Sequence, residues 1–224
     1  DSAYGARVIA EPTHRWSRAE QVKWAMDRGA PYGKPGEVYH YSDTGYILLG
    51  EIVERVSRMP LASAFRTLLN YDKLGLTNTW METLEPIPAG TGERAHQYQG
   101  DIDSYGFDPS LDLWGGGGND ATVKDMAVFT RALFTGGVYD KKTTIDTMLT
   151  LAPARDNKGY RFGISPVVID SVQGYGHTGY WNTFSYYYPD IDVAIAGAVT
   201  QNHEYKLAKA LNVAALSVVK RAAP

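Results

Sequence analysis

The sequence lacks several features that would each point to a particular class of protein. It contains no cysteine, which excludes disulfides, thiolate catalysis and cysteine-based zinc sites. Its longest apolar stretches, such as residues 193–199, are far too short to span a bilayer. With 22 Lys and Arg against 25 Asp and Glu, the net charge is −3. No basic patch or stripe of the kind that binds nucleic acid is therefore expected.

Patterns for common cofactor and catalytic sites are also absent. The five histidines lie at 14, 40, 96, 177 and 203 and show no His-x-His or His-Glu-x-x-His spacing, so no metal site is expected. No serine has glycine at both −2 and +2, which excludes the nucleophile elbow of an ordinary Ser-His-Asp hydrolase. Residues 115–118 are all glycine, but no Gly-Lys-Ser/Thr follows them, so a wall of a cleft is favoured over a phosphate cradle. Neither metal nor cofactor is expected.

Five helices are predicted in the first two thirds of the chain. Residues 17–28 begin with a capping box formed by Ser17 and Glu20. A helix over 121–135 is capped by Asn119 or Asp120 and ends at two glycines, 136 and 137. The others cover 44–58, 61–70 and 142–151. In the helix over 44–58 one face carries a set of apolar residues, namely Leu48, Leu49, Ile52, Val53 and Val56.

Strands follow in the last third of the chain. Residues 160–169, 173–179, 182–188 and 192–200 are predicted as consecutive strands, and 204–220 as a terminal helix. The last strand has alanines on one face, where we expect the terminal helix to pack through its apolar residues (Leu207, Leu211, Ala214, Ala215 and Val218). Residues 83–120 read as long loops with at most a short strand pair. The sequence therefore predicts an α+β fold, with a mostly helical region over 1–158 and an antiparallel sheet with its helix over 159–224.

Two short motifs carry the chemistry. Tyr41-Ser42-Asp43 directly precedes the helix over 44–58, and His177-Thr178-Gly179 lies on a predicted strand ahead of Tyr180 and Trp181. Their order and surroundings resemble those of the penicillin-recognising serine hydrolases, which include serine β-lactamases, D-alanyl-D-alanine carboxypeptidases and related esterases. That family has three motifs: Ser-x-x-Lys, then Tyr-x-Asn or Ser-x-Asn, then Lys-Thr-Gly or His-Thr-Gly. The resemblance covers nearly the whole chain and implies a β-lactamase/transpeptidase-like fold.

The resemblance also implies roles for these residues. Tyr41 would move the proton, with His177 beside it in the catalytic group. Asp43, Thr178, Gly179 and Trp181 would contact the substrate, and the backbone N–H of Tyr180 would form half of an oxyanion hole. The reaction would pass through an acyl-enzyme, and the substrate would be an ester, an amide, a β-lactam or a D-amino-acid peptide. Family members are often periplasmic or secreted.

The nucleophile of the family does not appear at its expected place. No Ser-x-x-Lys lies within residues 1–40, and Ser217-Val-Val-Lys220 falls after the other two motifs, in the terminal helix. We therefore expect the native protein to carry an upstream segment with the nucleophile helix, an N-terminal helix and two strands. Without that segment the sheet would have an unpaired edge and an uncovered face.

Two observations leave a non-catalytic alternative open. Asp43 stands where the family has Asn, and an ionised carboxylate can only accept hydrogen bonds where an amide also donates. Ser42 or Asp43 also has an ordinary structural role, as the N-cap of the helix over 44–58. A binding or interaction protein with the same fold is therefore the alternative to an enzyme.

Overall fold

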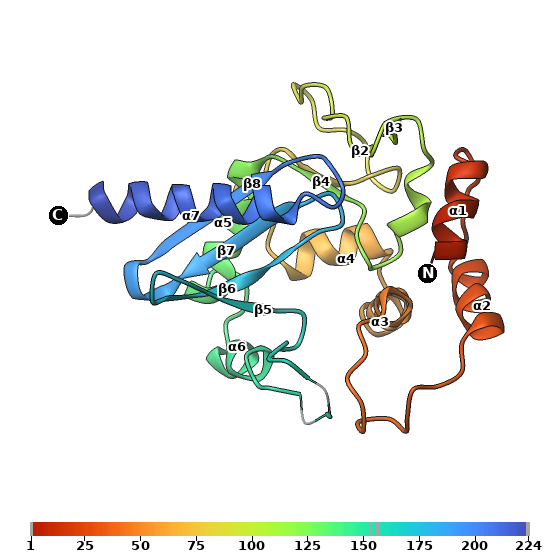
Figure 1. Cartoon of the computed structure of the whole chain (residues 1–224), viewed down its shortest axis with the longest axis horizontal. Helices are drawn as coiled ribbons and strands as arrows, with labels where there is room; N and C mark the ends of the chain where they lie inside the picture. The colour runs from red at the N-terminus through yellow and green to blue at the C-terminus, as the bar shows by residue number, and fades with distance from the viewer. Residues whose placement is uncertain (1, 153, 156, 223–224) are drawn as a thin grey trace.

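The computed structural model describes residues 2–152, 154–155 and 157–222, and it has the α+β architecture that the sequence predicts. Its centre is an antiparallel sheet with strand order β5-β6-β7-β8. These strands are β5 (Ser165–Ile169), β6 (Val172–Thr178), β7 (Thr183–Tyr188) and β8 (Val193–Ala198). The sheet lies between two helices, α5 (Val123–Thr135) and α7 (Tyr205–Ala222) (Figure 1).

The alanine face of β8 is covered by α5, so the prediction that the terminal helix packs there is wrong. Ala196 pairs with Ser185 of β7, and the Ser185 hydroxyl bonds Thr130 of α5 at 2.5 Å. Phe134 of α5 stacks on Tyr187, the partner of Ala194, with ring centroids 5.6 Å apart. Small alanines let α5 approach this face closely, which leaves α7 for the other one.

The terminal helix α7 packs through a different stripe from the predicted one. Ala208 and Leu216 are buried with Phe184, Tyr186 and Ile195 in one hydrophobic cluster. Three of the apolar residues predicted to pack (Leu207, Leu211 and Val218) are instead exposed, at 48%, 45% and 56%. Both stripes of α7 are apolar, and only one faces the sheet.

Most of the remaining helices lie to one side of the sheet and build the second part of the molecule, while the short helix over residues 142–148 packs against α5 (Figure 1). They are α1 (Ser2–Ala10), α2 (Arg18–Arg28), α3 (Asp43–Ser57), α4 (Leu61–Leu68) and α6 (Lys142–Met148), with short 3₁₀ turns η1 (Pro109–Asp112) and η2 (Pro189–Ile191). The sequence did not predict α1. The molecule also has two small antiparallel strand pairs. In one, β1 (Thr79–Met81) pairs with β4 (Asn119–Ala121), and in the other, β2 (Tyr98–Gln99) pairs with β3 (Ile102–Asp103).

The helix caps show where local sequence decided the structure. Ser17 and Glu20 form the predicted capping box of α2, with the Ser17 N–H donating to Glu20 at 2.8 Å. The prediction for α5 was wrong by a few residues: Thr122 caps the helix, accepting from the Asp125 N–H at 3.1 Å. Asn119 and Asp120 are held instead in β4, paired with β1.

Helix α3 buries the side opposite to most of its apolar residues. Gly50 lies against the loop after η1, where a Cβ would come 2.3 Å from the Trp114 carbonyl oxygen. Val53 joins the cluster around Leu61 and Met81. The other four apolar residues of the predicted face are exposed, at 46% for Leu48, 51% for Leu49, 53% for Ile52 and 79% for Val56. We call these four residues the α3 stripe.

Candidate active site

Tyr41 lies at the entrance to α3, and the local sequence holds it there. The Ser42 hydroxyl caps the helix by accepting from the Gly45 N–H at 3.3 Å, which fixes the backbone next to Tyr41. The Tyr41 side chain is 49% exposed, and its hydroxyl has no hydrogen-bond partner among the residues that the structure describes. The tyrosine therefore presents a free hydroxyl to the solvent side of the site.

The His-Thr-Gly strand lies beside this tyrosine. His177 is in β6, and its ring lies roughly parallel to that of Tyr41, with centroids 6.3 Å apart. Both ring nitrogens of His177 are engaged: Nδ1 lies 2.6 Å from the Thr178 carbonyl oxygen, and Nε2 lies 2.9 Å from the Tyr160 hydroxyl. The fold thus brings Tyr41 and His177 together, although they are 136 positions apart in the sequence.

A tight turn joins β6 to β7, and four of the predicted binding residues lie at it. Gly179 donates to the Thr183 carbonyl at 2.7 Å, and Asn182 closes the turn back onto Gly179 at 3.0 Å. Asn182 has a positive φ of 56° and anchors the turn by donating from Nδ2 to the Gln201 carbonyl at 2.6 Å. Thr178, Gly179 and Tyr180 are exposed on this turn, and Trp181 packs on Tyr180 with ring centroids 4.9 Å apart.

The backbone N–H of Tyr180 has no hydrogen-bond partner within the described part of the chain. An exposed, unpaired N–H at the end of a strand can donate to an incoming oxyanion. The oxyanion-hole role of this N–H stays a prediction.

Tyr160 belongs to the same cluster, and the sequence analysis missed it. Its ring lies 5.9 Å from Tyr41 and 5.6 Å from His177, edge-on to both. Residues 160–169 were predicted as one strand, but β5 begins only at Ser165. The preceding segment turns instead, because Asn157 Oδ1 accepts from the N–H groups of Gly159 and Tyr160 at 3.0 and 2.8 Å. Asn and Gly two positions apart were the signal for this turn.

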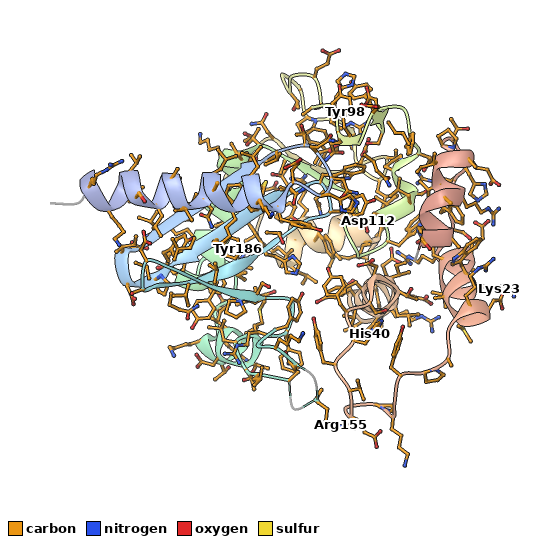
Figure 2. All side chains as sticks on the ribbon, viewed as in Figure 1. Lys23, His40, Tyr98, Asp112, Arg155 and Tyr186 are labelled. Atoms are coloured by element: carbon orange, nitrogen blue, oxygen red, sulfur yellow. The ribbon has the colours of Figure 1, made fainter. Side chains whose placement is uncertain are left out.

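Acidic groups dominate the electrostatics of the site. Burial, followed by the charge of Asp43, raises the pKa of Tyr41 to about 12. Burial and then Asp43 also raise the pKa of the Asp112 carboxyl to about 7. Asp112 is the last residue of η1, shortly before the glycine run, and it is labelled in Figure 2. With these residues alone, Tyr41 stays a neutral phenol at physiological pH.

The glycine run 115–118 fits closely between α3 and Asp112. A Cβ on Gly115 would lie 2.4 Å from the Tyr46 carbonyl oxygen, and Gly115 has a φ of +125°. On Gly116 and Gly117 a Cβ would lie 2.6 and 2.4 Å from the two carboxylate oxygens of Asp112. The run therefore packs tightly against α3 and Asp112, and its place in the wall of a cleft stays a prediction.

Two kinds of feature are absent from the described residues, a metal-binding cluster and a membrane-spanning helix. No group of three or more His, Cys, Asp or Glu side chains among them could hold a metal ion. No helix in that part of the chain is both long and apolar enough to cross a membrane.

The fold and the pairing of a Tyr-Ser-Asp helix entrance with a His-Thr-Gly strand define the class of penicillin-recognising serine hydrolases. The Beta-lactamase family model matches residues 5–220, so the chain belongs to the Beta-lactamase family. A Salmonella schwarzengrund (strain CVM19633) protein named "Putative D-alanyl-D-alanine carboxypeptidase" is 30% identical over 219 residues. That alignment covers 83% of this chain and 50% of the relative.

Solved structures show the same fold. The D-amino acid amidase from Ochrobactrum anthropi SV3, complexed with D-phenylalanine, aligns with a TM-score of 0.75 at 19% identity, covering 94% of this chain and 66% of the amidase. A D-stereospecific amidohydrolase from Streptomyces sp. gives 0.74 at 21% identity, covering 89% and 61%. A penicillin binding protein from Bacillus halodurans gives 0.68 at 21% identity, covering 86% and 62%. The chain thus spans about half the length of the curated relatives it matches.

Proposed function

We propose that the chain forms the acid–base and substrate-binding part of a serine hydrolase that acts on an ester or amide through an acyl-enzyme. The observation that supports this most directly is the free Tyr41 hydroxyl beside the His-Thr-Gly strand. An amide of a D-amino acid is the favoured substrate class, because the structural relatives include a D-amino acid amidase and a D-stereospecific amidohydrolase.

In the proposed reaction a serine outside this sequence attacks the substrate carbonyl. Tyr41 takes the serine proton and passes it to the leaving group. The Tyr180 N–H donates to the oxyanion, while Thr178, Gly179, Trp181 and Asp43 line the bound substrate. Water then attacks the acyl-enzyme, and Tyr41 reverses its role to release the acid.

Tyr41 needs a nearby cation to act as a base. Its pKa of about 12 arises from burial and from acidic or phenolic neighbours, none of which favours the phenolate. The lysine of a Ser-x-x-Lys turn would lower that pKa by placing a positive charge beside the hydroxyl. We therefore propose that an upstream segment supplies both serine and lysine, packs on the α3 stripe and pairs with the free edge of the sheet at β8.

The alternative proposal is a binding protein that keeps the fold without turnover. It is favoured by Asp43, whose negative charge opposes ionisation of Tyr41 where the family's Asn would not. The two proposals differ in whether a protein that includes the upstream segment hydrolyses any substrate.

The test compares Tyr41→Phe with the parent in a protein that includes the upstream segment. An activated ester and D-phenylalanine amide serve as substrates. Loss of the acid–base hydroxyl is expected to lower kcat by roughly 10²-fold or more. Tyr32→Phe is the matched control, because Tyr32 is 70% exposed and its ring stacks on His40 rather than on Tyr41 or His177. An unchanged kcat in Tyr41→Phe would remove Tyr41 from the mechanism, and a parent with no activity would support the binding protein.

A further inference from the structure

Tyr160 has no role in the reaction proposed above, yet it contacts both Tyr41 and His177. Its hydroxyl lies 2.9 Å from His177 Nε2, and its ring meets the Tyr41 ring edge-on at 5.9 Å. The hydrogen-bond partners of the His177 ring therefore determine which of these three side chains can transfer a proton.

The hydrogen bonds assign the protons on His177. The Thr178 carbonyl can only accept, so Nδ1 at 2.6 Å carries a proton. In the neutral ring Nε2 then has a lone pair and accepts the Tyr160 O–H. Tyr160 keeps that proton, because burial raises its pKa far above the usual range.

The position of Tyr160 is fixed from both sides. Asn157 clamps its backbone, accepting from the Tyr160 N–H at 2.8 Å and donating to the Tyr160 carbonyl at 3.0 Å. The segment before Tyr41 is tied to the same region, because the Tyr39 N–H donates to the Arg155 carbonyl at 2.9 Å. The Tyr39 ring also packs on Tyr160, with centroids 5.6 Å apart. His40 and Arg155 mark these two segments in Figure 2.

We propose that Tyr160 is a positioning residue, whose hydroxyl donates to Nε2 and holds His177 as a neutral Nδ1–H ring that aligns Tyr41. With both nitrogens engaged, His177 takes no proton from the substrate or the serine. Proton transfer then falls to Tyr41, the hydroxyl of this cluster without a partner among the described residues. This inference rests on the proposed function for its catalytic consequence, although the hydrogen bond itself does not.

The hydrogen bond is tested by ¹⁵N NMR of the purified protein at pH 9, where histidine side chains are neutral. The His177 signals are assigned by their loss in His177→Phe. In the parent, Nδ1 should be the protonated nitrogen and Nε2 the bare one. In Tyr160→Phe the ¹⁵N chemical shift of Nε2 should move toward that of an imidazole nitrogen that accepts no hydrogen bond. In Tyr39→Phe this chemical shift should stay unchanged. An Nε2 signal that is the same in Tyr160→Phe and the parent would overturn the inference.

The catalytic consequence is tested by a double-mutant cycle in the protein that includes the upstream segment. Tyr160→Phe should lower kcat by roughly 3–10-fold with KM unchanged, the size expected for one lost hydrogen bond. In a His177→Phe background the same change should have no further effect, because Tyr160 acts through His177. Independent, multiplying effects would overturn the positioning role. An inactive parent with the expected Nε2 shift would contradict the proposed function and leave the hydrogen bond established.

Discussion

At the scale of single residues, the unusual feature of the site is its surplus of negative charge. The charge of Asp43 helps to raise the pKa of Asp112, and the charges of both carboxylates help to raise the pKa of Tyr41. The Asp112 carboxyl lies against the backbone of Gly116 and Gly117, although the residue keeps an exposed surface. No hydrogen bond to Asp112 is found in the described part of the chain. A carboxylate without donors is a cost to the folded state when it is ionised.

Asp112→Asn is expected to stabilise the protein at pH 8 and to have little effect near pH 4. The folded state raises the pKa of Asp112 from 3.8 to about 7, so the folded protein binds more protons than the unfolded chain in that window. Stability therefore falls as pH rises from about 4 to about 7, and the amide removes this loss. Melting temperatures measured across this pH range check the sign.

Asp108→Asn is the matched control for that measurement. Asp108 is four positions earlier, and burial alone would raise its pKa, but hydrogen bonds from Ser110 and the charge of Arg15 outweigh burial and lower it. Its substitution should therefore destabilise the protein at pH 8, which is the opposite sign. Equal effects of the two substitutions would contradict the assignment of Asp112.

The sequence predicts most residues of the candidate site but does not predict Tyr160. Tyr41, Asp43 and residues 177–181 belong to ordered motifs, whose spacing along the chain is visible. Tyr160 reaches His177 only because Asn157 turns the chain before β5. That contact depends on tertiary placement, which no short pattern specifies.

At the scale of elements, α3 depends on close backbone contact with the glycine run. Gly50 and Gly115 face each other across this contact, with the Trp114 carbonyl 2.3 Å from a Cβ on Gly50. A Cβ on Gly45, the other glycine in α3, would lie 3.9 Å from its nearest neighbour, the Ser42 side chain. Replacing each glycine by alanine therefore separates the effect of packing on stability from the effect of helix propensity.

Gly50→Ala is expected to destabilise the protein by about 1–3 kcal/mol, because the backbone of 114–115 must shift to admit the methyl group. Gly45→Ala should be neutral or stabilising by up to about 1 kcal/mol, since alanine favours the helix. Urea denaturation of both variants measures the difference. A Gly50→Ala variant as stable as Gly45→Ala would show that α3 is free to move away from the loop.

Element types were predictable, but the faces that pack were not. Apart from α1, the helices and the four strands of the sheet follow from periodicity, caps and turn residues. In α7 the stripe of Leu207, Leu211 and Val218 is as apolar as the stripe around Ala208 and Leu216. Which of them meets the sheet depends on where α5 lies, and that is a property of the assembled fold.

At the scale of the whole molecule, two apolar surfaces lie exposed. One is the α3 stripe, and the other consists of Leu207, Leu211 and Val218 on α7. Contiguous exposed apolar surface of this kind marks contact with another segment or partner. The end strand β8 also has one side that pairs with no strand among the described residues. Helices and strands of an upstream segment would cover these features together.

Ile52→Asp tests whether the α3 stripe is such a contact. In the 224-residue chain Ile52 is 53% exposed, so the substitution should change stability by no more than about 0.5 kcal/mol. In a protein that includes the upstream segment, the same aspartate would be buried without a partner and should cost several times more. Met26→Asp is the control, because Met26 is 74% exposed on α2, outside the stripe, and should be neutral in both proteins. If Ile52→Asp costs as little in the longer protein as in the chain, the upstream segment packs elsewhere, and the proposed source of the serine and lysine next to Tyr41 fails with it.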